Sequence, residues 1–237
     1  MGYRNEDEME IKEKLAFTLA EVLITLGVIG VVAAITIPGL ITSYNKKITE
    51  TRLAKFYSVF NQAIRLSVAE NGDVDTWDDY WDNNGIITGG QENQTGVEKA
   101  FDTYLRPYMQ IAYKKRIHHG QDKILYVLPD GGAFAYNVWG TRDITFFPKD
   151  AEKCIARNKS IGICSFMFIF YPISEAESWK YHYNKGIEPY LYDWDGSEAH
   201  LKSGATYSCA NSGYYCTAMI KNNGWKIPKD YPLKLQY

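Results

Sequence analysis

The cysteines are the residues whose type and spacing point most directly to chemistry. There are four, Cys154, Cys164, Cys209 and Cys216. An even number in an exported domain is typical of disulfide bonds, whereas the absence of CxxC spacing disfavours the rival zinc site. Four cysteines allow three connectivities. The local pairs Cys154–Cys164 and Cys209–Cys216 would close loops of about ten and about seven residues, and each bond would contribute about 2–3 kcal/mol.

An acidic turn is a weak candidate for a calcium site. Asp193, Asp195 and Glu198 bring three carboxylates close together in the sequence. A calcium loop needs more oxygen ligands at set spacing, so calcium is a weak candidate here and a solvated turn is the favoured interpretation. No other cofactor is expected.

A basic strip at residues 113–119, YKKRIHH, is a weak candidate for binding DNA. Lysine and arginine neutralise phosphates, and aromatic rings stack on bases. The strip is short and the formal net charge of the chain is −2, so a solvated surface is favoured. His182 and His200 stand alone and are expected to be structural or exposed. There is no nucleophile elbow, HExxH motif or phosphate loop, so we do not expect an enzyme.

The most apolar segment lies at residues 17–37, FTLAEVLITLGVIGVVAAITI, and its single charge is Glu21. A helix of about 20 apolar residues spans the hydrocarbon core of a bilayer. A buried helix of a soluble protein is the alternative, but no other segment of the chain is as long and as apolar. The run is longer than the core of a secretory signal peptide, and no small-x-small cleavage site follows it. The sequence therefore predicts one membrane-spanning helix.

The start of this segment resembles a known motif. Ala16 followed by Phe17-Thr-Leu-Ala-Glu21 is similar to the cleavage and methylation site of type IV pilins and type II secretion pseudopilins. The resemblance covers about residues 12–45 and implies that a prepilin peptidase cuts between Ala16 and Phe17, removes residues 1–16 as a leader and methylates the amine of Phe17. The sequence departs from the pattern in having Ala16 where glycine is usual, and in a leader with more acids than bases.

The resemblance also implies a role for Glu21. A carboxylate inside an apolar helix costs several kcal/mol unless it is paired. In the family, this glutamate is thought to meet the new N-terminal amine of a neighbouring subunit, which would couple charge neutralisation to assembly. The alternative is a glutamate near the membrane surface whose side chain reaches water.

The helical pattern continues beyond the apolar run. Apolar residues recur at spacings of three or four up to Val68, and Asn71-Gly72 supplies a stop. One helix is therefore expected over 17–71, with an amphipathic second half and a bend at Pro38.

Residues 72–237 are expected to form a globular head. The fold class is α+β, with the long helix packed on a C-terminal antiparallel sheet, as in pilins. The expected elements are a loop over 73–96, a helix over 97–109, a hairpin over 124–139 and strands over 143–147 and 165–170.

The sequence thus predicts a structural subunit, a pilin or pseudopilin, of a type IV pilus-like or type II secretion filament. The alternatives are a minor pilin for DNA uptake, or a tethered binding domain or enzyme with a pilin-like anchor. The implied partners are the prepilin peptidase, copies of itself and other pilin-like subunits, the inner-membrane assembly platform and membrane lipid. The protein would cross the cytoplasmic membrane once, export its C-terminal domain and end in an extracellular or periplasmic filament.

Overall fold

A computed structural model describes residues 18–77, 80, 94–119, 121–137 and 140–237. The chain divides into two units, Met1–Ser43 and Tyr44–Tyr237. Helix α1, Leu19–Asn71, contributes to both. The predicted helix is confirmed within the described residues, and its second half belongs to the same unit as the predicted head. The expected leader lies outside the described residues.

In the first unit, threonine hydroxyls of α1 bond back to carbonyl groups of the helix itself. The hydroxyl of Thr25 donates to the carbonyl of Val22 at 3.0 Å, and that of Thr36 donates to Val32 at 2.9 Å. Such bonds hide hydroxyl groups within an apolar segment. The helix passes through Pro38 without interruption, and the bend expected there stays a prediction.

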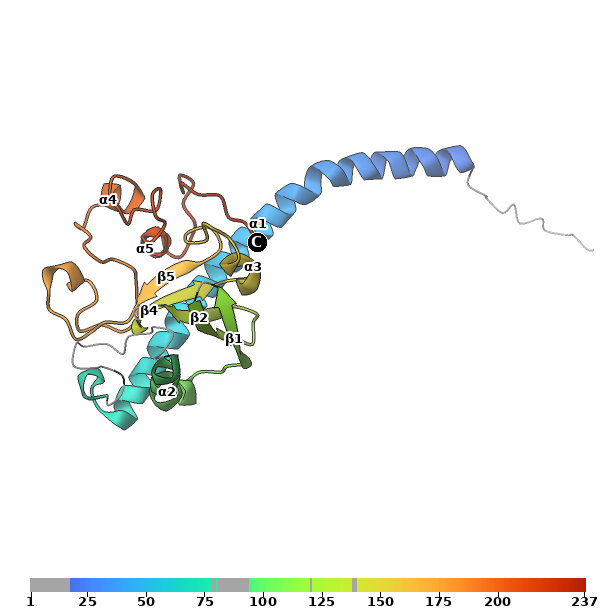
Figure 1. The fold of residues 1–237 in the computed structure, drawn as a ribbon. Coiled ribbons are helices and arrows are strands. Elements are labelled where there is room, and N and C mark those ends of the chain that lie inside the picture. The colour runs from blue at the N-terminus through green and yellow to red at the C-terminus, as the bar shows by residue number, and fades with distance from the viewer. Residues whose placement is uncertain (1–17, 78–79, 81–93, 120, 138–139) are drawn as a thin grey trace, which may run out of the picture. The chain divides into compact units, whose positions relative to one another are not determined.

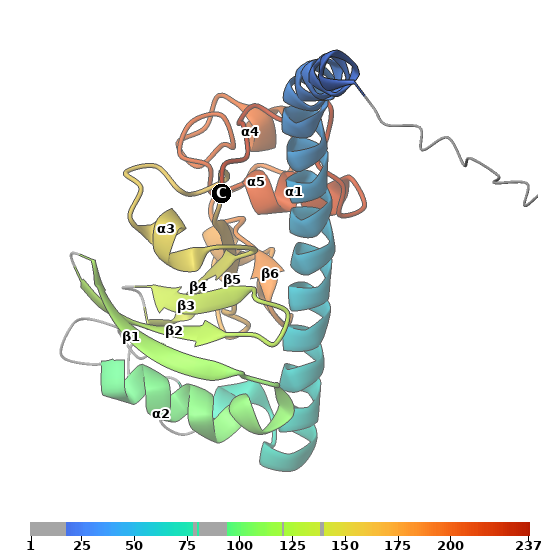
Figure 2. The same cartoon turned by 90° about the vertical axis from the view of Figure 1, so that its right-hand side faces the viewer.

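The second unit is built on a six-stranded antiparallel sheet (Figure 2). Its strands follow one another in space as in the sequence, which confirms the expected α+β class. The sharp turn after Leu128 closes the predicted hairpin, with Gly131 at a φ of +82°. The strands are β1 (Tyr113–His119), β2 (Gln121–Val127), β3 (Ala133–Asn137), β4 (Gly140–Phe147), β5 (Phe166–Ile169) and β6 (Glu188–Pro189).

One face of the sheet is covered by the second half of α1 and by α2, Gln94–Tyr104 (Figure 1). The Phe56 ring of α1 stacks on Phe146 of β4, with ring centroids 4.3 Å apart. From α2, Phe101 packs on Tyr126 of β2 at 4.4 Å. The helix expected over 97–109 leaves the α conformation before Pro107, which disfavours helix in the preceding residue, and continues as η3, Arg106–Tyr108.

The other face of the sheet is covered by short elements and by the two disulfide bonds. Successive side chains of a strand point to opposite faces, so the residues between the α1-facing ones contact this second layer. Cys154–Cys164 packs on one part of this face, and the region around Cys209–Cys216 packs on the other. Both disulfide bonds are therefore confirmed in the local pairing. Besides η3, the short elements in the described residues are η1 (Val74–Thr76), α3 (Ala151–Ile155), η4 (Glu177–Trp179), α4 (Glu198–Lys202) and α5 (Cys216–Asn222).

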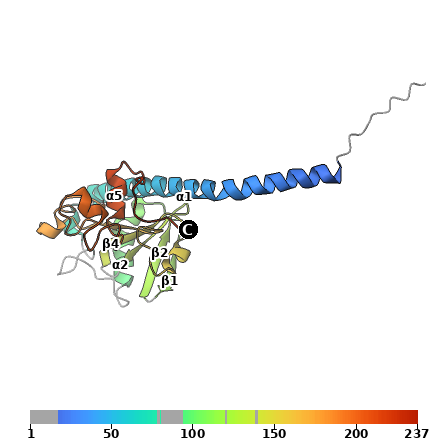
Figure 3. The ribbon, with the colours of Figure 1, turned by 90° about the horizontal axis from the view of Figure 1, so that it is seen from above.

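Polar contacts attach the second half of α1 to the head. Glu50, buried in α1, accepts a hydrogen bond from the backbone N–H of Ile227 at 2.9 Å. One end of α5 lies beside the same helix, seen from above in Figure 3, with the ammonium of Lys221 4.5 Å from the Tyr57 ring. Asn61 donates to the carbonyl of Ile187 at 3.1 Å. These bonds fix the register of the helix on the head, which apolar packing alone specifies less sharply.

Candidate functional sites: the helix start and a tyrosine-lined pocket

The start of α1 is a capping box formed by Thr18 and Glu21. The backbone N–H and the hydroxyl of Thr18 both donate to Oε2 of Glu21, each at 2.8 Å. In return, the N–H of Glu21 donates to the Thr18 hydroxyl at 3.3 Å. The spacing T-x-x-E is the usual signature of this arrangement, and it satisfies amide groups that have no partner inside the helix. The two residues of the predicted cleavage site, Ala16 and Phe17, lie outside the described residues.

The surface around Glu21 is apolar and open. Leu19, Leu23 and Ile24 are each more than half exposed. Glu21 is the only charged residue from Thr18 to Asn45. The described residues contain one helix, α1, that is long and apolar enough to cross a membrane. This feature is what a single-pass membrane protein requires.

The acidic turn forms the N-terminal cap of α4. The backbone N–H of Ser197 donates to Oδ1 of Asp195 at 2.8 Å, and the Ser197 hydroxyl accepts from the N–H of His200 at 3.1 Å. Asp193 and Glu198 do not join Asp195 in a cluster. Nowhere in the described part of the chain do three or more His, Cys, Asp or Glu side chains gather in a way that could hold a metal ion.

The basic strip is strand β1, at the edge of the sheet, and its cations are paired with carboxylates. Lys114 bonds to Glu98 at 2.6 Å and to Asp102 at 2.7 Å, both on α2. Arg116 bonds to Glu98 at 2.9 Å, and Lys115 bonds to Glu152 at 2.7 Å. Their charges are largely neutralised where they stand, which weakens the attraction that the strip would exert on phosphates.

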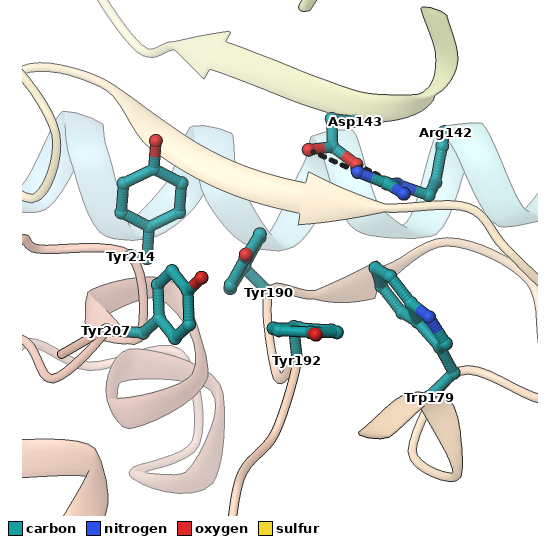
Figure 4. Close-up of a pocket in the computed structure, with 7 residues that line it drawn as sticks. All are labelled: Arg142, Asp143, Trp179, Tyr190, Tyr192, Tyr207 and Tyr214. Atoms are coloured by element: carbon teal, nitrogen blue, oxygen red, sulfur yellow. Dashed lines mark hydrogen bonds and ion pairs between the residues drawn. The ribbon is translucent and has the colours of Figure 1, made fainter. Parts of the chain in front are cut away.

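A tyrosine-lined pocket lies on the face of the sheet that α1 does not cover. It is a cavity of about 350 Å³. In Figure 4 the side chains of Arg142 and Asp143 reach it from β4, with Tyr214 beside them on the left and the other lining residues lower in the view. Its remaining lining residues are Trp179 at the end of η4, Tyr190 and Tyr192 just after β6, and Tyr207 and Tyr214 near the C-terminal disulfide bond.

The two charged residues of the pocket are paired with each other. Nε of Arg142 lies 2.5 Å from Oδ1 of Asp143, and the guanidinium carbon lies 4.7 Å from the centre of the Trp179 ring. The Asp143 side chain is only 4% exposed. Burial raises the pKa of this carboxyl, and the guanidinium opposes that shift. The pair places a donor group and an acceptor group side by side without adding net charge.

Aromatic rings form the rest of the pocket wall. Trp179 and Tyr192 have ring centroids 4.6 Å apart, and Tyr190 and Tyr214 are 4.7 Å apart. Burial, together with the nearby Asp143 carboxylate, raises the pKa of Tyr214 and also that of Tyr190. Both side chains therefore keep their phenolic proton at neutral pH, and each hydroxyl can donate a hydrogen bond.

Local structure holds these rings in place. The N–H of Tyr215 bonds to the carbonyl of Tyr207 at 2.9 Å, and its hydroxyl donates to the carbonyl of Tyr192 at 2.6 Å. Gly213, just before Tyr214, has a φ of +85°, and a Cβ there would lie 2.3 Å from the carbonyl oxygen of Ile161. The disulfide bond Cys209–Cys216 closes this segment. The pocket was not predicted; its only signal in the sequence is the density of Trp and Tyr over residues 179–215.

Comparison with protein families gives one match, over residues 39–235, to a family of unknown function (DUF6613). The matched region includes every residue that lines the pocket and begins after Glu21. No curated protein and no solved structure matches the chain.

Proposed function

We propose that this chain, which belongs to DUF6613, a family of unknown function, is a membrane-anchored subunit of a pilin-like filament. It is inserted and assembled through the first half of α1. The observation that carries the proposal is Glu21, a lone carboxylate in an exposed apolar helix. An acid within a membrane span is costly and marks a functional position by default. A helix that served only as a membrane anchor would insert more favourably without this carboxylate.

The geometry of Glu21 fits a partner from another chain. Both hydrogen bonds that its carboxylate accepts from Thr18 go to Oε2. In the described residues no donor reaches Oε1, which leaves this oxygen free for the amine of a neighbouring subunit. The resemblance of residues 16–21 to a prepilin cleavage site supports an amine at Phe17 as that donor. An ion pair that forms only when two helices align would set the register of assembly.

The attachment of α1 to the head supports the same proposal. Residues 44–71 pack on the sheet and bond to the C-terminal segment, whereas the apolar side chains of residues 19–41 are largely exposed. The helix can therefore link a membrane-inserted end to an exported domain. A type IV pilus, a secretion pseudopilus and a DNA-uptake pilus all use such a subunit. The pocket favours a second candidate, a tethered binding domain that does not assemble.

The test separates the charge of Glu21 from its capping role. Glu21→Ala removes both, Glu21→Gln keeps hydrogen bonding without the charge, and Thr18→Val removes the capping hydroxyl and keeps the carboxylate. Breaking a buried ion pair costs about 3–5 kcal/mol. We expect Glu21→Ala to remain in the membrane fraction and to be absent from sheared filaments, Glu21→Gln to be intermediate and Thr18→Val to match the native protein.

The readout is a blot for this subunit in sheared filaments and in membranes of the native cells. Normal recovery of Glu21→Ala in filaments would contradict the assembly role. Equal losses for Glu21→Ala and Thr18→Val would assign Glu21 to capping alone. If the native protein never enters the sheared fraction, the tethered binding domain becomes the better description.

A further inference from the structure

The wall of the tyrosine-lined pocket combines flat apolar faces with polar edges. The Trp179 and Tyr192 rings meet at 52°, and those of Tyr190 and Tyr214 meet at 66°, so the rings that line the cavity present faces in different directions. Aromatic faces carry partial negative charge and attract the weakly positive C–H bonds of a ligand. Tyrosine adds a hydroxyl at the ring edge, where it can bond to a polar substituent of the same ligand.

Two hydroxyl groups of this wall are available for hydrogen bonds to a ligand. Tyr192 and Tyr214 are both partly exposed. Within the described parts of the chain, neither hydroxyl forms a hydrogen bond to another protein group. The Arg142–Asp143 pair adds donors on the guanidinium and an acceptor on the carboxylate at the same cavity. A ligand with several hydroxyl groups, each both donor and acceptor, would satisfy the two tyrosine hydroxyls and could also bond to this pair.

The charges of the pocket argue against an ionic ligand. Aromatic pockets also recognise ammonium groups. Here a cation already lies over Trp179, since the guanidinium of Arg142 is 4.7 Å from that ring. A second cation would meet Arg142, and an anion would meet Asp143. Arg142 and Asp143 are the charged residues among those lining the cavity, and their charges cancel. A neutral ligand fits best.

We propose that the tyrosine-lined pocket binds a neutral saccharide. The C–H face of a sugar ring packs on the aromatic wall, and its hydroxyl groups bond to the Arg142–Asp143 pair and to the hydroxyls of Tyr192 and Tyr214. A volume of about 350 Å³ lies at the lower end of the range for small-molecule sites. This inference does not depend on filament assembly, because the pocket lies within the second unit alone.

The experiment uses the full chain in a polyoxyethylene detergent, which contains neither sugar nor amine. An array of neutral mono- and oligosaccharides identifies a binding sugar, and saturation-transfer NMR then measures its affinity and maps which protons contact the protein. Tetramethylammonium and glucuronate serve as cationic and anionic probes. We expect a neutral saccharide to bind through ring C–H protons and the two charged probes to give no signal.

Variants then locate the site. Trp179→Ala should weaken binding at least tenfold, since it removes one ring of the aromatic wall and the ring on which the Arg142 guanidinium rests. Tyr192→Phe and Tyr214→Phe keep the rings, so they keep the fold, and each should weaken binding several-fold. Tyr113→Ala is the matched control, because Tyr113 is a 58% exposed tyrosine on β1 outside this cavity, and it should bind like the native chain.

Several results would overturn the proposal. They are the absence of any bound saccharide across the array, a preference for tetramethylammonium or glucuronate, or saccharide binding that survives both Trp179→Ala and the two phenylalanine variants.

Discussion

At the residue scale, His182 is an unusual buried base next to the pocket. It is fully buried, and its ring lies 5.8 Å from that of Trp179. Its Nε2 accepts a hydrogen bond from the N–H of Leu191 at 3.3 Å, so the proton of the neutral ring lies on Nδ1. Within the described residues Nδ1 has no hydrogen-bond partner. Burial lowers the pKa of His182 from 6.5 to about 3, and the charges of Lys185 and Arg142 add to this shift.

This shift predicts how stability depends on pH. The unfolded chain takes up a proton at His182 as the pH falls through 6.5, and the folded chain does so only near 3. The stabilisation is therefore complete above 6.5 and is lost as the pH falls toward 3. Between pH 7 and pH 5 the loss should be about 2 kcal/mol.

Urea unfolding of the native chain and of His182→Leu, each at both pH values, measures this contribution. The native chain should lose about 2 kcal/mol more than the variant on going to pH 5. The raised pKa of Asp143 acts in the opposite direction, but it is common to both proteins and cancels in the comparison. Parallel pH dependence of the two proteins would show that His182 is not buried as a neutral base.

At the element scale, two glycines with the same backbone conformation allow the cost of backbone strain to be distinguished from the cost of a side-chain collision. Gly213 and Gly204 have φ values of +85° and +86°. A Cβ at Gly213 would collide with Ile161, whereas a Cβ at Gly204 would meet nothing within 4 Å. Placing alanine in this conformation costs about 1–2 kcal/mol, and overpacking adds about 1–3 kcal/mol.

We therefore expect Gly213→Ala to lower the free energy of unfolding by about 2 kcal/mol more than Gly204→Ala does. Urea unfolding of both variants under identical conditions measures the difference. Equal losses would mean that the segment before Tyr214 moves away from Ile161 at little cost, and that the pocket is less rigid than its hydrogen bonds suggest.

The elements also show what the sequence could predict. The hairpin of β2 and β3 was predicted because Pro129-Asp-Gly-Gly132 is a strong turn signal between apolar runs. Strand β1 was missed, since an edge strand with Lys114, Lys115 and Arg116 exposed resembles a charged surface. The capping role of Glu21 was also missed, although its spacing from Thr18 could have revealed it.

The pocket could not be predicted in the same way. Its residues come from β4, η4 and the segments around β6 and Cys209–Cys216, so long-range pairing brings them together. Periodicity describes only neighbours in sequence. The pairing of Arg142 with Asp143 depends on the burial of that end of β4, which no local pattern encodes.

At the scale of the whole molecule, the proposed processing predicts a defined N-terminus. If a prepilin peptidase acts on the chain, mass spectrometry of protein from native membranes should find Phe17 first, with one added methyl group. Substituting the residue before the cut, Ala16→Leu, should leave the leader attached, because glycine is usual at this position of the prepilin sites that residues 16–21 resemble, and leucine is much larger. An unprocessed Met1, or a cut after Pro38, would contradict the proposed function and leave the pocket proposal intact.

The two edges of the sheet bear on how copies of the head behave when they are crowded together. An exposed edge strand invites the edge of another molecule to pair with it, which leads to aggregation. Here the β1 edge carries three exposed cations held by carboxylates, and β6 at the opposite edge is only two residues long and ends in Pro189. Proline lacks the N–H that a new strand would need. Sheets of neighbouring heads should therefore stay separate at high local concentration, so that contacts between heads are made by side chains and can be exchanged without unfolding.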